Sequence, residues 1–359
     1  MTGIIFVAGL VLLVLGAEAL VRGAARLAVT AGVTPLVVGL TVVAYGTSTP
    51  EAAVSIQAAM QGNADIAVGN VVGSSIFNVL AILGMSALIA PLTVSTQLVR
   101  SDVPIMIGTS LLLVVVAWNQ VIGRGEGAAL LILAVAYTVL VIQLGRRAVA
   151  AIGAPRQEAV GTIPGNIGLV LLGLVLLVAG ARLLVDSAVV FATALGVSPL
   201  VIGLTIVAAG TSLPELATSI AATIRGQRDI AVGNVVGSNI FNILFVLGAT
   251  ALISPETLRV ATSALTFDIP FMIAVAVACL PIFFTGYTIE RWEGAMFMLF
   301  YVAYTAYLVL HGVAHSAAPV IREVMLLYVV PLTTLTLIVI AWREWRSHRM
   351  ATRRAPFEP

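Results

Sequence analysis

Charged residues are scarce in this chain of 359 residues, and lysine is absent altogether. Charged side chains account for 9% of the sequence and hydrophobic ones for 60%, and the mean hydropathy is +1.12. This composition excludes a water-soluble globular domain of this size and is typical of a protein embedded in a lipid bilayer. The single cysteine, Cys279, lies in an apolar run and excludes an internal disulfide, so redox chemistry is not expected.

Apolar stretches long enough to cross about 30 Å of hydrocarbon recur along the chain. They predict an all-α, multi-pass membrane protein with eleven spans. The predicted spans are 3–22, 35–60, 66–90, 103–118, 127–145, 166–190, 199–223, 230–254, 267–285, 292–311 and 323–342.

The sequence contains a long internal repeat. Residues 32–91 and 196–255 align without a gap at an offset of 164, and 40 of these 60 positions are identical. The similarity extends back to Gly16 and Gly180, so each repeat covers about five helices. An odd number of spans makes the second copy enter the membrane from the opposite side. We therefore expect two inverted five-helix repeats plus one extra C-terminal transmembrane helix, an arrangement suited to alternating access.

The repeat divides the chain into five segments. Residues 1–145 form the first repeat, 146–165 a cytoplasmic linker, 166–311 the second repeat, 312–342 the eleventh helix, and 343–359 a basic cytoplasmic tail. With the N-terminus outside, 14 arginines fall on the inner side of the membrane and three on the outer side. The positive-inside rule therefore predicts a cell (inner) membrane protein with its N-terminus outside and its C-terminus in the cytoplasm.

Each repeat places one glutamate deep in an apolar span. The motifs are GTSTPE at 46–51 and GTSLPE at 210–215, which end in Glu51 and Glu215. A carboxylate at that depth costs several kcal/mol unless it is neutralised, so both are functional candidates. Thr47 and Ser48 precede Glu51 by four and three residues, which puts hydroxyls and carboxylate on one helix face. Pro50 lacks an N–H, and its ring exposes nearby backbone carbonyls.

The third helix of each repeat carries a polar stripe. Asn70, Ser74 and Asn78 recur every four residues, and the second repeat matches them with Asn234, Ser238 and Asn242. Carboxylates, hydroxyls, amides and carbonyls together form an all-oxygen set, which suits Ca2+ or Na+ better than softer metals. For any single residue of the stripe, hydrogen bonding between helices is the competing interpretation.

The GTSTPE and GTSLPE motifs, together with the polar stripes that follow them, resemble the paired alpha-repeats of the calcium/cation antiporter superfamily. They are most similar to those of the prokaryotic sodium/calcium exchangers. The resemblance rests on GLTVVAYGTSTPEAAVSI with GNVVGSSIFNVLAILG, and on GLTIVAAGTSLPELATSI with GNVVGSNIFNILFVLG. It implies that the metal ligands are Glu51, Glu215, Thr47, Ser48, Thr211, Ser212, Ser74, Asn78, Ser238 and Asn242, with carbonyl oxygens from Ala44, Thr47, Ala208 and Thr211.

Two features depart from that family pattern. The prokaryotic exchangers have ten helices, so the eleventh is additional. Some relatives carry an aspartate where this chain has Asn242, and without that third acid the ion stoichiometry and any K+ dependence stay open.

The expected function is a secondary antiporter, not an enzyme, that exchanges Ca2+ for Na+ by alternating access. Two ionised glutamates would be neutralised by Ca2+ or by Na+ but not by both, and an unneutralised pair would be too costly to move. Ca2+ and Na+ are transported ions, the lipid bilayer is the surrounding partner, and no cofactor or nucleic-acid partner is expected. Between a monomer and an oligomer the sequence does not decide.

Three other functions compete with this interpretation. A Ca2+/H+ antiporter would use the same glutamates as proton carriers, and the Ser- and Asn-rich surroundings favour Na+ over H+ only weakly. An intramembrane hydrolase is disfavoured because no Ser/His or Asp/Asp constellation stands beside the acids. A channel would have no need of inverted halves.

The first and sixth helices carry a charge pattern that is swapped between the repeats. Glu18 and Arg22 correspond, at the same offset, to Arg182 and Asp186. Their spacing of four favours local pairs within each helix. The alternative hypothesis is that the two helices lie side by side, with Glu18 paired to Arg182, and slide together over the ion site.

Overall fold

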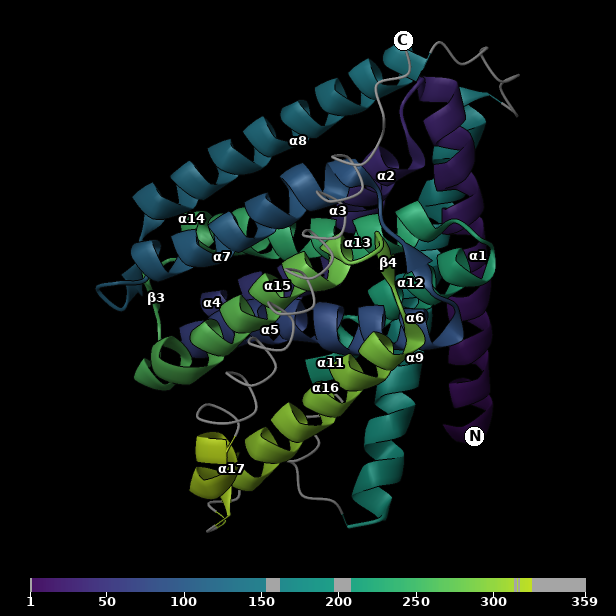
Figure 1. Cartoon of the computed structure of the whole chain (residues 1–359). Coiled ribbons are helices and arrows are strands. Elements are labelled where there is room, and N and C mark those ends of the chain that lie inside the picture. Colours follow the sequence, from purple (N-terminus) through teal and green to yellow (C-terminus); the bar gives the residue numbers. More distant parts are fainter. Residues whose placement is uncertain (1, 153–161, 197–207, 313–314, 316, 325–359) are drawn as a thin grey trace.

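The computed structural model describes residues 2–152, 162–196, 208–312, 315 and 317–324. This part of the chain is almost entirely helical (Figure 1). Eight of its helical stretches are long and apolar enough to cross a membrane, and two shorter apolar helical stretches cover Pro35–Thr47 and Leu213–Ile224. The prediction of an all-α membrane protein is thus confirmed. Most of the eleventh predicted span, the basic tail and part of the seventh span lie outside the described residues.

The first half runs from the N-terminus to the end of α8. Its helices and strands are α1 (Thr2–Ala31), α2 (Pro35–Val38), the π-helical η1 (Gly39–Val43), α3 (Ala44–Thr47), α4 (Thr49–Met60), α5 (Ala64–Phe77), π-helical η2 (Asn78–Leu83), α6 (Gly84–Ile89), β1 (Leu92–Thr93), π-helical η3 (Leu98–Asp102), α7 (Val103–Val116), β2 (Val121–Ile122) and α8 (Arg124–Ile152).

The second half repeats this order. It comprises α9 (Ile163–Ala194), α11 (Ala208–Gly210), α12 (Leu213–Ile224), α13 (Arg228–Phe241), π-helical η5 (Asn242–Leu247), α14 (Gly248–Ile253), β3 (Leu258–Arg259), π-helical η6 (Ala264–Asp268), α15 (Ile269–Phe284), β4 (Thr288–Ile289) and α16 (Arg291–Gly312), and α17 (Ala318–Val324) follows. Because α8 continues to Ile152, part of the segment expected as a linker, 146–165, is helical.

The four strands, two residues each, were not expected from the sequence. They form two antiparallel pairs, β1 with β4 and β2 with β3, and each pair joins one half of the chain to the other. Leu92 faces Ile289 in the first pair, and Ile122 faces Leu258 in the second. Two short ladders therefore hold the two halves together at the ends of their helices.

The second predicted span, 35–60, is not one continuous helix, so that expectation is wrong in detail. The chain leaves helical geometry at Ser48, where ψ is 5°, and α4 starts at the next residue with Pro50 in its first turn. The same break recurs at Ser212, with ψ of 10°, ahead of α12. A proline in the first turn of a helix needs no hydrogen-bond partner for its nitrogen, so each break is placed by its proline.

The fourth span also differs from its predicted limits of 103–118. The spanning stretch is Leu98–Val116, because η3 extends α7 backward by five residues. Asp102 lies inside this stretch and is fully buried.

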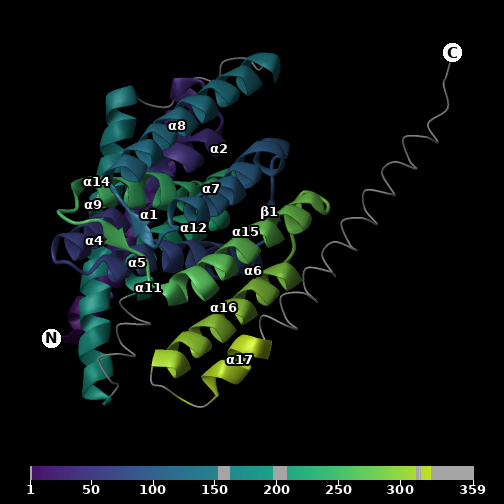
Figure 2. The ribbon, with the colours of Figure 1, turned by 90° about the vertical axis from the view of Figure 1, so that its left-hand side faces the viewer.

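The α5–η2 and α13–η5 segments form the centre of the molecule. Most residues of the Arg228–Ile253 stretch are buried, whereas α1, α8 and α9 bury a third or less of theirs. Helices α15 and α16 run side by side (Figure 2), and the rings of Phe271 and Tyr304 stack with their centroids 4.9 Å apart. The site motifs are thus carried by the innermost segments, with longer apolar helices outside them.

Helices α1 and α9 lie side by side and run at a steep angle to α7, α8 and α15 (Figure 1). The first and sixth helices are therefore neighbours, as the alternative hypothesis required, although Glu18 does not pair with Arg182. Glycines allow the contact: a Cβ on Gly16 would lie 2.7 Å from the Leu177 nitrogen, and one on Gly173 would lie 2.6 Å from the Leu20 nitrogen. Such close backbone approach is the usual way in which helices pack inside a membrane.

We predict that Gly173→Ala loosens the α1–α9 pair. The added methyl group would meet backbone atoms that cannot move aside, and overpacking of this kind costs about 1–3 kcal/mol. The measurement is the thermal unfolding midpoint of the purified protein in detergent, which should fall.

Gly168→Ala on the same helix is the matched control, because Gly168 is exposed and a Cβ there meets nothing within 4 Å. An equal midpoint for the two variants would contradict close glycine packing.

Candidate functional site

Glu51 and Glu215 occupy equivalent positions at the start of two helices. Each is the third residue after its helix break, in α4 and α12 respectively. Glu51 is 0% exposed and Glu215 is 1% exposed. The first turn of a helix is the position at which the helix dipole stabilises negative charge, so the break gives each buried carboxylate partial compensation.

The two carboxylates are bonded by serines of the opposite repeat. Ser212 donates to Oε1 of Glu51 at 2.7 Å, and Ser48 donates to Oε1 of Glu215 at 3.2 Å. The sequence had placed Ser48 on the same helix face as Glu51. Because the helix breaks at Ser48, this side chain instead points to the other half of the chain. The reciprocal bonds tie the two motifs into one site.

Two asparagines outside the predicted ligand set hold the broken helices. In the second half, Asn234 donates to the Glu215 carbonyl at 3.4 Å and to Ser219 at 3.0 Å, and its Oδ1 accepts from Thr47 at 3.1 Å. Asn234 therefore joins α12, which carries Glu215, to the GTSTPE motif of the first half.

The first half repeats this arrangement. Asn70 donates to the Glu51 carbonyl at 3.2 Å and to Ser55 at 3.0 Å, and its Oδ1 accepts from Thr211 at 3.4 Å. The four-residue polar stripe was the signal that identified these asparagines. Their part in the structure is to brace the carboxylate helices.

The carbonyl of Ala44 differs from its expected state. It accepts the Ser48 N–H at 3.0 Å and the Thr47 hydroxyl at 3.4 Å, so it is not bare. A carbonyl oxygen has two lone pairs and can accept further contacts. Its counterpart, Ala208, begins α11.

The polar stripes of α5–η2 and α13–η5 meet at the centre of the molecule. Asn242 donates to Ser74 Oγ at 2.9 Å, and Asn78 donates to Oδ1 of Asn239 at 3.0 Å. Asn239 in turn donates to the Ser75 carbonyl at 3.2 Å.

Sequence reasoning missed Asn239. The available signal was a break in the repeat, because Ser75 stands at the equivalent position of the first half.

Five buried oxygens of this site have no hydrogen-bond partner among the described residues. They are Glu51 Oε2, Glu215 Oε2, Asn78 Oδ1, Asn242 Oδ1 and Ser238 Oγ. Leaving such groups without a partner in an apolar interior costs about 1–3 kcal/mol each and more for a charged group. Carboxylate, amide and hydroxyl oxygens are the ligands that hard cations prefer. The set therefore has the chemistry of a cation site, and its two carboxylates, when ionised, give it a formal charge of −2.

Two further acids outside this site form matched pairs with tyrosines. Tyr137 donates to Asp102 at 3.4 Å, and Tyr304 donates to Asp268 at 3.0 Å. Gln97 also donates to Asp102, at 3.4 Å. In each half the bond joins the start of α7 or α15 to the long helix that follows it, α8 or α16.

These features define a membrane ion transporter: helices that span the bilayer, a central break in one helix of each half, and two buried carboxylates surrounded by oxygen ligands. The family model described as sodium/calcium exchanger protein matches residues 2–143 and 165–310. The chain belongs to this family of antiporters, and it is therefore a transporter and not an enzyme.

Curated relatives extend over most of the chain. The inner membrane protein YrbG of Escherichia coli is 38% identical over 283 residues, which cover 77% of this chain and 87% of YrbG. The sodium/calcium exchanger MaX1 of Methanosarcina acetivorans is 35% identical over 340 residues, covering 84% of this chain and 96% of MaX1.

A solved structure of the sodium-calcium exchanger NCX_Mj, soaked with 2.5 mM Na+ and 0.1 mM Ca2+, aligns with a TM-score of 0.74 and 31% identity. The alignment covers 85% of this chain and 97% of that one. The similarity therefore includes both the exchanger fold and the sequence.

We predict that Asn234→Leu and Asn70→Leu destabilise the protein although leucine is close to asparagine in shape. Each change removes three hydrogen bonds, to the Glu carbonyl, the Ser hydroxyl and the Thr hydroxyl, and a lost hydrogen bond of this kind costs about 0.5–1.5 kcal/mol. The measurement is again the thermal unfolding midpoint.

Gln57→Leu on α4 serves as the control because Gln57 is exposed. The bracing role would be refuted by a midpoint as high in the asparagine variants as in this control.

Proposed function

We propose that the chain exchanges Ca2+ for Na+ across the cell (inner) membrane by alternating access at one central site. The observation that carries the proposal is the set of five buried oxygens without a partner, all of them on residues identified as ligands from the sequence. Ca2+ takes six to eight oxygen ligands, and its charge balances two carboxylates. A cation bound among these residues would supply the partner that such oxygens lack.

Each ligand has a defined part in this proposal. Glu51 and Glu215 supply the charge, with Oε1 held by a serine and Oε2 left for the ion. Asn78, Asn242 and Ser238 supply neutral oxygens from the central helices. The remaining proposed ligands, which form the rest of the oxygen shell, are Thr47, Ser48, Thr211, Ser212, Ser74, and the carbonyls of Ala44 and Ala208.

The coupling of the two ion fluxes follows from electrostatics. Two bare carboxylates in an apolar interior are too costly to carry through the conformational change, so the site moves only when cations neutralise it. Because Ca2+ and Na+ compete for the same oxygens, one ion leaves when the other binds. The chain is placed with its N-terminus outside and its C-terminus in the cytoplasm, on the distribution of arginines.

Transport by the purified protein in proteoliposomes tests this function. We expect 45Ca2+ uptake driven by an outward Na+ gradient, reduced at least about 100-fold in Glu51→Gln and in Glu215→Gln. A carboxylate–cation contact at 4 Å is worth roughly 4 kcal/mol per pair of unit charges near a protein surface, which is ample for that loss.

Glu126→Gln is the matched control, since Glu126 accepts the Gly123 N–H in a loop at the start of α8, far along the chain from both motifs. Uptake driven by a H+ gradient and not by Na+ would transfer the protein to the Ca2+/H+ class. Full activity of the two site variants would refute the proposed site.

A further inference from the structure

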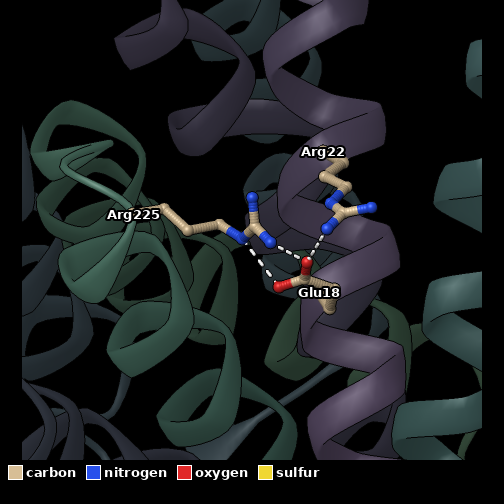
Figure 3. Close-up of polar contacts among 3 residues, drawn as sticks. All are labelled: Glu18, Arg22 and Arg225. Atoms are coloured by element: carbon tan, nitrogen blue, oxygen red, sulfur yellow. Dashed lines mark hydrogen bonds and ion pairs between the residues drawn. The ribbon is translucent and has the colours of Figure 1, made fainter.

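Glu18 of α1 contacts two arginines, and only one of them lies on its own helix (Figure 3). Arg22, one turn further along α1, forms an ion pair with Oε1 of Glu18. Arg225 approaches from α12: its Nε donates to Oε2 at 2.7 Å, and its Nη2 forms an ion pair with Oε1. The expected local pair is thus confirmed for Glu18 and Arg22. Arg182 forms no ion pair with any residue that the structure describes.

Arg225 connects this contact to the ion site. It caps the C-terminal end of α12, the helix that carries Glu215 in its first turn. Ten residues separate Glu215 from Arg225, which corresponds to about 15 Å along a helix. The α1–α9 pair is therefore fastened to the far end of the helix that holds one of the two carboxylates.

Apart from this contact, the surface between α1 and α12 is apolar. Leu13, Val14, Leu216 and Ile220 are among the side chains that line a groove of about 480 Å³ between the two helices, and Glu18 and Arg225 also line it. Aliphatic side chains packed around a groove allow several registers, because dispersion contacts have no direction. A bidentate arginine–carboxylate pair has a fixed geometry and defines one register.

The second half of the molecule has no equivalent of this pair. At the offset of the repeat, Glu18 corresponds to Arg182 and Arg225 corresponds to Gln61, the residue that caps α4. Arginine and glutamine form no ion pair. In the structure α1 and α9 both pack on α12, and neither packs extensively on α4.

We propose that Glu18 and Arg225 are positioning residues, which hold the α1–α9 pair on α12 and stabilise this conformation over its counterpart. The inference rests on the alternating-access function proposed above. In an inverted repeat the opposite conformation exchanges the roles of the two halves, so the pair would then lie along α4. Arg182 would meet Gln61 there, and the stabilising ion pair would be missing. The Glu18–Arg225 ion pair, called the latch below, therefore stabilises only one of the two conformations.

Cross-linking between introduced cysteines measures both conformations. Val14→Cys with Ala221→Cys joins two residues that line the α1–α12 groove, and Val14 is 60% exposed. At the repeat offset, Val178→Cys with Gln57→Cys reports the counterpart arrangement on α4. The native Cys279 is fully buried, so a short bifunctional maleimide reacts at the introduced positions.

We expect Arg225→Gln to slow cross-linking of the first pair and to accelerate that of the second. The ratio of the two rates should change by about 1.5- to fivefold, the range for a partly exposed ion pair. Gln61→Glu keeps the native latch and gives Arg182 a partner in the other conformation, so it should shift the ratio in the same direction. The charge swap Glu18→Arg with Arg225→Glu should restore the original ratio.

Arg22→Gln is the matched control, because it removes an arginine from the same carboxylate without crossing between helices, and it should leave the ratio unchanged. A ratio that responds equally to Arg22→Gln and Arg225→Gln, or a charge swap without rescue, would overturn the latch. Ca2+ uptake is measured in the same vesicles: uptake with an unaltered ratio refutes the latch alone, and an altered ratio without uptake refutes the exchange function alone.

Discussion

Two carboxylates buried in the apolar centre of a membrane protein set the terms for the rest of this structure. Glu51 and Glu215 are almost completely shielded from solvent, and each needs partners that an aliphatic interior cannot supply. The breaks at Ser48 and Ser212 place them at helix starts, the serines bond one oxygen of each, and the asparagine braces hold the breaks open. One oxygen of each carboxylate, Oε2, has no hydrogen-bond partner among the described residues and is available to a cation.

Hydrogen bonds of the site join side chains of one repeat to side chains of the other. Ser48 serves the carboxylate of the other half, Thr47 bonds the Asn234 brace of the other half, and Asn242 bonds Ser74. A site assembled in this way belongs to neither half and changes when one half moves against the other. In the proposed mechanism the glycine-packed α1–α9 pair, which contacts α12 through Arg225, carries this movement, and the movement occurs only when cations occupy the site.

Much of this could be predicted from the sequence, because the repeat shows identical residues where the site needs them. Hydropathy and the repeat were sufficient for the membrane fold, and the motifs at 46–51 and 210–215 for the glutamates. Contacts between the two halves of the chain could not be predicted. The partner of Ser48 depends on the break in its helix, the role of Asn239 depends on an exception to the repeat, and Glu18 meets Arg225 only because α1 packs on α12. Spacing along a helix reports local neighbours and is silent on these.

Equilibrium Ca2+ binding by the purified protein at increasing Na+ concentration tests the central claim most directly, which is that one pair of carboxylates holds either ion but not both. The account predicts that Na+ raises the apparent Kd for Ca2+ while the number of bound Ca2+ ions stays at one per chain, and that Glu51→Gln with Glu215→Gln abolishes binding. Ca2+ binding that is unaffected by Na+, or that persists in the double variant, would contradict it.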